Sequence, residues 1–154
     1  MSLTHIIVIA GAMLAQTQSG QPPPVSISVV AVQATTEGGA KQFGPGLEGV
    51  QSALADLEFD RYRKLGAATL SAPFNKESSL DLGSGYSLCV TPLSRERNGQ
   101  VRISLMVEMA SKAADGRPVN AVSTTIMIGP GKQFKLRGLK MDQGELVVVM
   151  SLDR

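Results

Sequence analysis

The chain has 154 residues, and its 15 basic and 13 acidic side chains give a formal net charge of +2 at pH 7. So small a charge does not favour general nucleic-acid binding. A single histidine, His5, and a single cysteine, Cys89, exclude an internal disulfide and leave no imidazole base after residue 5. Because aromatic residues make up only 4% and tryptophan is absent, the core is expected to be aliphatic.

The first segment along the chain is an uncharged apolar run from Ile6 to Ala15. It is too short for a transmembrane helix, which needs about 20 residues. An apolar run followed by small and polar residues resembles the apolar region of a secretory signal. We therefore expect a leader at 1–20, a proline-rich spacer at 21–24 and a single domain at 25–154. The alternative is an N-terminal arm of the mature protein, because the first five residues include no lysine or arginine.

The body of the chain is patterned as β-strands with one helix near its start. Residues 25–34 alternate at first and then become apolar on both faces, which indicates a strand that is covered on two sides in its second half. A glycine-rich loop follows, and apolar residues at helical spacing then predict a helix near residues 47–58; these are Leu47, Val50, Leu54 and Leu57. From Arg61 onward the period is two, and strands are expected at 61–72, 78–82, 86–93, 101–110, 119–128, 132–139 and 145–152.

Turn residues separate these strands, and Asn98-Gly99 between two alternating runs is the strongest hairpin signal. We expect both of these residues to occupy left-handed backbone geometry. Further turns are predicted at Asp115-Gly116, Gly129-Pro130-Gly131 and Asp142-Gln143-Gly144. The predicted class is α+β, mostly antiparallel, as a β-sandwich or a meander sheet of about six to eight strands with one covering helix.

The tail from Val101 to Leu152, about a third of the chain, resembles the strand-rich half of secretin-type outer-membrane domains, and the segment from Gly131 to Leu139 carries the most specific likeness. In that family a glycine-led strand ends in a Gly-Gly-Leu type of turn. The chain departs from the pattern at Arg137, which stands where the first glycine of the turn is expected. Alternating strands around such a turn are common, so the family is not assigned.

No motif predicts catalysis, a metal site or a cofactor. The glycine-rich stretch from Gly38 to Gly46 lies between a strand and a helix, where backbone N–H groups can bind anions, but it fits no phosphate-loop spacing and is interpreted as a connector. Asp56, Glu58 and Asp60 lack the glycine and glutamate of a calcium loop, so we expect a solvated helix end. We therefore predict no catalytic residues, no metal ligands and no cofactor.

The candidate partner-binding residues are basic and lie on two predicted hairpins. If these hairpins lie together, their side chains would bind an anionic polymer or an acidic protein surface. The structural alternative is an edge strand that carries charge to prevent aggregation. The residues are Arg95, Arg97, Arg102, Lys132, Lys135, Arg137 and Lys140.

Together these features predict an exported, non-catalytic, β-rich binding module of a bacterial-type cell envelope, secreted or periplasmic. Its partner would be a protein or an anionic polymer, with no specific nucleic acid. The first alternative is a structural subunit of a secretin-like or filament-like envelope assembly, which would form homo-oligomers through an edge strand. The second alternative is a small hydrolase that uses carboxylates or a Ser–Lys pair.

Overall fold

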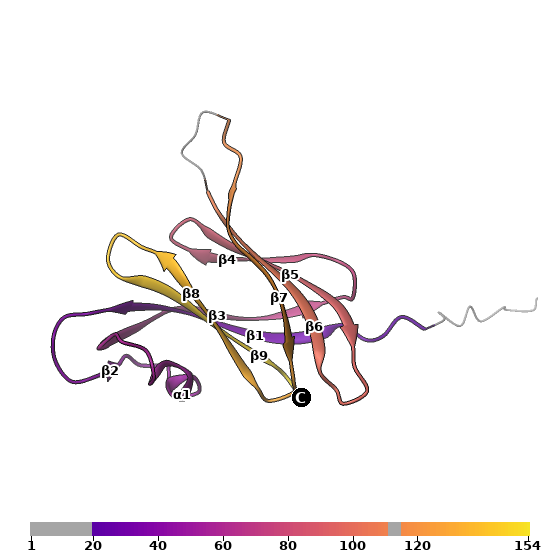
Figure 1. Ribbon diagram of the computed structural model, residues 1–154, viewed down its shortest axis with the longest axis horizontal. Helices are drawn as coiled ribbons and strands as arrows, with labels where there is room; N and C mark the ends of the chain where they lie inside the picture. Colours follow the sequence, from indigo (N-terminus) through magenta and orange to yellow (C-terminus); the bar gives the residue numbers. More distant parts are fainter. Residues whose placement is uncertain (1–19, 111–114) are drawn as a thin grey trace, which may run out of the picture.

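The computed structural model describes residues 20–110 and 115–154, and these residues form two β-sheets and one short helix (Figure 1). The predicted leader lies outside the described residues, except for Gly20. The elements are β1 (Val25–Thr35), β2 (Gln42–Phe43), α1 (Gln51–Leu54), β3 (Arg61–Ala72), β4 (Ser78–Gly83), β5 (Tyr86–Arg95), β6 (Val101–Met109), β7 (Val119–Ile128), β8 (Gln133–Lys140) and β9 (Glu145–Leu152).

The five-stranded sheet has the order β2-β3-β1-β9-β8, and the four-stranded sheet has the order β4-β5-β6-β7. Every pair is antiparallel except β2 with β3. The N-terminal strand β1 therefore lies in the middle of its sheet, between β3 and β9. The prediction of a mostly antiparallel, sandwich-like fold is confirmed.

The main core lies between the two sheets, where their inner faces meet. Strand β6 shows how alternation fills it, because every second residue from Val101 to Val107 has an exposed fraction of 0%; these residues are Val101, Ile103, Leu105 and Val107. The two sheets are also linked by a hydrogen bond, in which the Tyr86 hydroxyl on β5 donates to the Lys140 carbonyl on β8 at 2.7 Å. Cys89 lies on β5 as a buried free thiol.

A second apolar cluster covers part of the outer face of the five-stranded sheet. Val32 and Ala34 of β1 contribute to it, together with Val147 and Val149 of β9. The segment around α1 packs over these side chains, on the side away from the four-stranded sheet (Figure 1). The prediction that the second half of β1 is covered on both sides is confirmed.

The predicted helix near residues 47–58 is much shorter in the structure, where α1 spans only Gln51–Leu54. The apolar positions were predicted correctly, because Leu47, Val50, Leu54 and Leu57 are all buried. The helical extent was wrong for two reasons. The helix start has no side-chain cap, and the carbonyls of Ala55 and Leu57 accept hydrogen bonds from the Lys41 ammonium instead of continuing the helix.

The Asn98-Gly99 hairpin is confirmed, since Arg95 pairs with Val101 across it. The backbone prediction was half wrong: Gly99 has φ +82°, but Asn98 does not have a positive φ. Instead the Asn98 side-chain oxygen accepts a hydrogen bond from the Gln100 N–H at 3.1 Å. A tight loop with two left-handed residues occurs one hairpin earlier, at Ser84 and Gly85, and was not predicted.

The two-residue strand β2 was also missed. It pairs with the start of β3, and the Phe43 ring stacks on Tyr62 with 4.9 Å between the ring centroids.

We predict that Gly144→Ala is strongly destabilising, because a Cβ at this position would lie 2.1 Å from the Ala34 carbonyl oxygen and φ is +76°. We expect a loss of more than about 3 kcal/mol in the free energy of unfolding, measured by urea denaturation. Gly138→Ala is the matched control. It has φ +87° but nothing within 4 Å of the added methyl group, so about 1 kcal/mol is expected. Equal losses in the two variants would contradict the close approach of the β8–β9 turn to β1.

Candidate functional site

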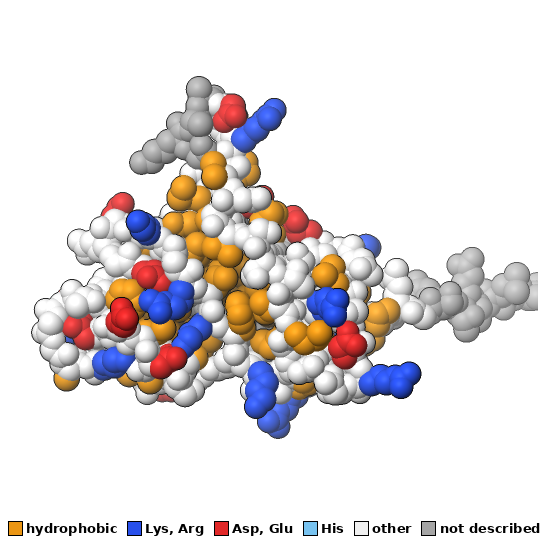
Figure 2. All heavy atoms as spheres, in the orientation of Figure 1, with side chains coloured by type: hydrophobic (Ala, Val, Ile, Leu, Met, Phe, Trp, Pro, Cys, Tyr) orange, Lys and Arg blue, Asp and Glu red, His pale blue; other side chains and the backbone are white. Residues whose placement is uncertain are grey.

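The seven predicted basic residues belong to two different sheets. Lys135, Arg137 and Lys140 lie on β8, the edge strand of the five-stranded sheet, whereas Arg95, Arg97 and Arg102 lie on or between β5 and β6 of the four-stranded sheet. Lys132 precedes β8. Figure 2 shows basic and acidic side chains interspersed on this face of the molecule and hydrophobic side chains gathered between β7 and β8.

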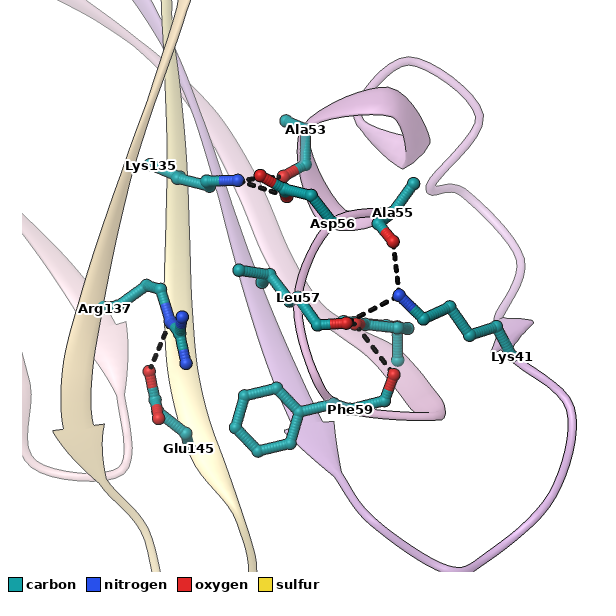
Figure 3. Close-up of polar contacts among 10 residues, drawn as sticks. Lys41, Ala53, Ala55, Asp56, Leu57, Phe59, Lys135, Arg137 and Glu145 are labelled. Carbon is teal, nitrogen blue, oxygen red and sulfur yellow. Dashed lines mark hydrogen bonds and ion pairs between the residues drawn. The ribbon is translucent and has the colours of Figure 1, made fainter.

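Lys135 holds the covering segment against the sheet (Figure 3). Its ammonium donates to the Ala53 carbonyl at 2.9 Å and forms an ion pair with Asp56. The hydrogen bond from Lys135 lowers the pKa of the Asp56 carboxyl below its ordinary value. From the opposite side Lys41 donates to the Leu57 carbonyl at 2.6 Å. Two lysines thus fix a segment whose backbone is mostly not helical.

Arg137 is also engaged within the chain. Its Nε lies 3.3 Å from a carboxylate oxygen of Glu145, and its guanidinium lies over the Phe59 ring at 5.8 Å from the centroid. The same carboxylate oxygen accepts a hydrogen bond from the Gly138 N–H at 2.8 Å. Lys135 and Arg137 thus contact other residues of their own chain from an edge strand. This arrangement favours the structural alternative, a charged edge strand, over a free binding surface at these two positions.

The remaining predicted bases lie nearer the β5–β6 loop, apart from Lys140. The Arg95 guanidinium lies over the Phe74 ring at 5.8 Å. The side chains of Arg97, Arg102 and Lys132 make no hydrogen bond or ion pair with any other described residue, although the Lys132 N–H donates to the Gly129 carbonyl at 3.1 Å. A Cβ placed on Gly129 would lie 3.6 Å from the Lys132 side chain and 3.7 Å from that of Gln100, so Lys132 sits beside this loop. The role of Arg97, Arg102 and Lys132 in partner binding stays a prediction.

The glycine-rich loop binds a carboxylate of its own chain. The N–H groups of Glu37 and Gly38 donate to the two carboxylate oxygens of Asp60, at 2.9 and 2.7 Å. The hydrogen bond from Glu37 is the largest cause that holds the pKa of Asp60 below its ordinary value, against the opposing effect of burial. The prediction of a solvated helix end was therefore wrong for Asp60, which has an exposed fraction of 9%.

A cavity of about 440 Å³ opens between the two sheets where β3 and β4 meet. Val29 and Ala31 of β1 lie against it from one sheet, and Leu80 and Leu82 of β4 lie against it from the other. Its volume falls within the range of small-ligand sites, and its lining is largely apolar. Among the lining residues only Asp81 is charged, so the cavity is suited to binding an apolar group.

Two β-bulges flank this cavity, one in β3 and one in β4. The β1–β3 register passes from Gly66 to Lys64 and leaves Leu65 unpaired, and the β4–β5 register passes from Asp81 to Gly83 and leaves Leu82 unpaired. Bulges bend a strand and are frequent beside functional sites. Sequence reasoning missed this cavity, although the small residues of the Leu65-Gly66-Ala67-Ala68 stretch were a signal for it.

A second, open depression lies at the end of the sandwich that holds the β4–β5 and β8–β9 turns. Ser84 and Lys140 both line it, and Asp142 is its one carboxylate. Ser84 and Lys140 form no hydrogen bond with each other in the described structure. The geometry therefore brings a serine and a lysine to one depression without joining them as a nucleophile and its base.

Comparisons with known proteins give no family: no family model matches the chain, and no curated protein matches it. The resemblance to secretin-type domains thus remains an observation on the sequence of residues 101–152. Across residues 20–110 and 115–154, none of the helices is long and apolar enough to cross a membrane. In the same ranges there is no cluster of three or more His, Cys, Asp or Glu residues placed to hold a metal ion.

We predict that Lys135→Met loosens the covering segment, because the Ala53 carbonyl and Asp56 lose their partner. The loss in the free energy of unfolding should be about 1–2 kcal/mol, with faster hydrogen exchange across residues 47–59. Lys132→Met is the matched control, since Lys132 makes no such bond, and should change stability by less than about 0.5 kcal/mol. Unaltered exchange in Lys135→Met would show that Lys135 is free for another role.

We predict that Asp60→Asn is destabilising at neutral pH, because the neutral amide is a weaker acceptor for the two N–H groups. The pKa of Asp60 is lowered from 3.8 in the folded chain, so the stability it contributes is present above that value and is lost as the pH falls through the folded pKa. The gap in unfolding free energy between the two proteins should therefore narrow in acid. Asp142→Asn, which removes no such bond, should show no comparable gap. A constant gap from neutral to acidic pH would contradict the role of the Asp60 charge.

Proposed function

We propose that this chain is an exported, non-catalytic β-sandwich module that binds a protein partner in a bacterial-type cell envelope. The observation that carries the proposal is the apolar cavity between β3 and β4, which is suited to hold an apolar group and is lined by a single charged residue. The apolar run from Ile6 to Ala15 supports export. The absence of histidine after residue 5 supports a function by contact, without bond-making.

An anionic polymer is the second candidate partner. It is favoured by Arg97, Arg102 and Lys132, whose side chains form no hydrogen bond or ion pair with other described residues and lie on or beside the β5–β6 loop. Such a partner would bind with a strong dependence on salt. A protein partner that uses the cavity would bind with little dependence on salt, because apolar contact is not screened.

Export is tested by intact-mass analysis of the protein made in its native host and recovered from the separated envelope and cytosolic fractions. We expect the envelope fraction to contain a chain that begins at Gln16 or close to Gly20. A cytosolic protein that still carries Met1 would contradict the proposal and favour the hydrolase or assembly alternatives.

The assembly alternative is tested by sedimentation velocity over a wide range of concentrations. We expect no assembly through the β8 or β4 edges, because the β8 edge is charged and bulged and β4 is only six residues long. Discrete oligomers or open-ended species that grow with concentration would instead favour a structural subunit.

A further inference from the structure

Two inward positions of β3 carry no side chain larger than a methyl group. Gly66 pairs with Ala31 and Ala68 pairs with Val29, and both partners line the cavity. Cross-strand partners project to the same face of a sheet, so positions 66 and 68 face the interior of the sandwich. A Cβ on Gly66 would meet no heavy atom within 4 Å, and its φ is not in the left-handed region. The backbone therefore does not require this glycine, and its absence of a side chain keeps the cavity open.

Beside the cavity β3 has an edge that lacks the usual protection. β2 pairs only with Arg61 and Tyr62, so residues 63–72 have no strand on the side away from β1 within the described structure. Residues 65–72 contain no charged residue and no proline. Sheets normally protect an edge of this length with charge or proline, as β8 does with Lys135 and Arg137. An unprotected edge is expected where a partner covers it.

From these two features we propose that β3 binds an extended segment of a partner protein. The segment pairs its backbone with residues 66–72 of β3 and places one apolar side chain in the cavity between β3 and β4. The inference rests on the proposed function and names the chemistry of its partner. A polypeptide fits this site because its N–H and C=O groups pair with those along the edge of β3, while a side chain fills the cavity.

The probe is a display library of random linear peptides, selected on the immobilised domain. Enriched peptides are synthesised, labelled and titrated by fluorescence anisotropy. We expect enriched sequences to share one large apolar residue, and Gly66→Leu to weaken their binding by about tenfold or more. Gly66→Leu fills the cavity from a position with open space, so its melting temperature should match or exceed that of the wild type. Ala68→Val, a smaller change in the same cavity, is the second variant if Gly66→Leu fails to fold.

Ala121→Leu is the matched control, because it adds the same side chain to an exposed site on β7, an edge strand of the other sheet. It should leave peptide binding unchanged. N-methylation of alternate backbone nitrogens of a bound peptide should abolish binding, because strand pairing needs those donors. If the Gly66→Leu substitution weakens peptide binding and N-methylation of the peptide abolishes it, the two results together would establish the site.

Three results would overturn the inference. Failure to enrich any peptide, or peptides that bind Gly66→Leu as well as the wild type, would exclude this site. Binding that survives N-methylation would leave a pocket for an apolar group without strand pairing. Dimerisation of the wild type that Gly66→Leu abolishes would show that a second copy is the occupant. None of these results bears on export, which intact-mass analysis tests separately, so an exported chain with no site on β3 would keep the export part of the proposed function and leave the anionic polymer as the candidate partner.

Discussion

The burial of β9 and of the second half of β1 on both faces is the constraint on which the rest of the fold depends. A strand with two buried faces cannot satisfy its backbone from water, so it needs a neighbour on each side. β1 accordingly pairs with β3 and β9 along most of its length. Its apolar residues on the inner face pack on the four-stranded sheet, and those on the outer face require a further cover. That cover is the segment from Leu47 to Leu57.

The charges of the chain serve this arrangement at three places. Lys41 and Lys135 satisfy carbonyls of the covering segment that helical hydrogen bonds leave free. Asp60 satisfies N–H groups of the glycine-rich loop. Each bond saturates a backbone group where the chain is irregular but packed. The basic residues that looked most like a binding patch on β8 are thus partly structural, and the bases beside the β5–β6 loop are the ones left for a partner.

Between β3 and β4, by contrast, side chains do not fill the space between the two sheets. Small residues at 66 and 68 and the bulges at Leu65 and Leu82 leave an apolar cavity beside an uncharged edge. Leucine at position 66 would meet no heavy atom within 4 Å of its Cβ, so the backbone does not require this space to be empty. Departures from the locally most stable choice are expected at functional sites. We therefore propose the binding site here and not at the charged edge.

The sequence alone determined every described strand except β2, most of their bounds, the mostly antiparallel class and the two-sided cover of the second half of β1, because these follow from local periodicity and turn residues. It also located the apolar residues of the covering segment, but not its short helix, because Lys41 reaches those carbonyls from a distant position in the chain. The cavity likewise depended on the tertiary structure. Only the register of β3 against β1, and the meeting of β3 with β4 from another sheet, brings Gly66 and Leu82 to the same space.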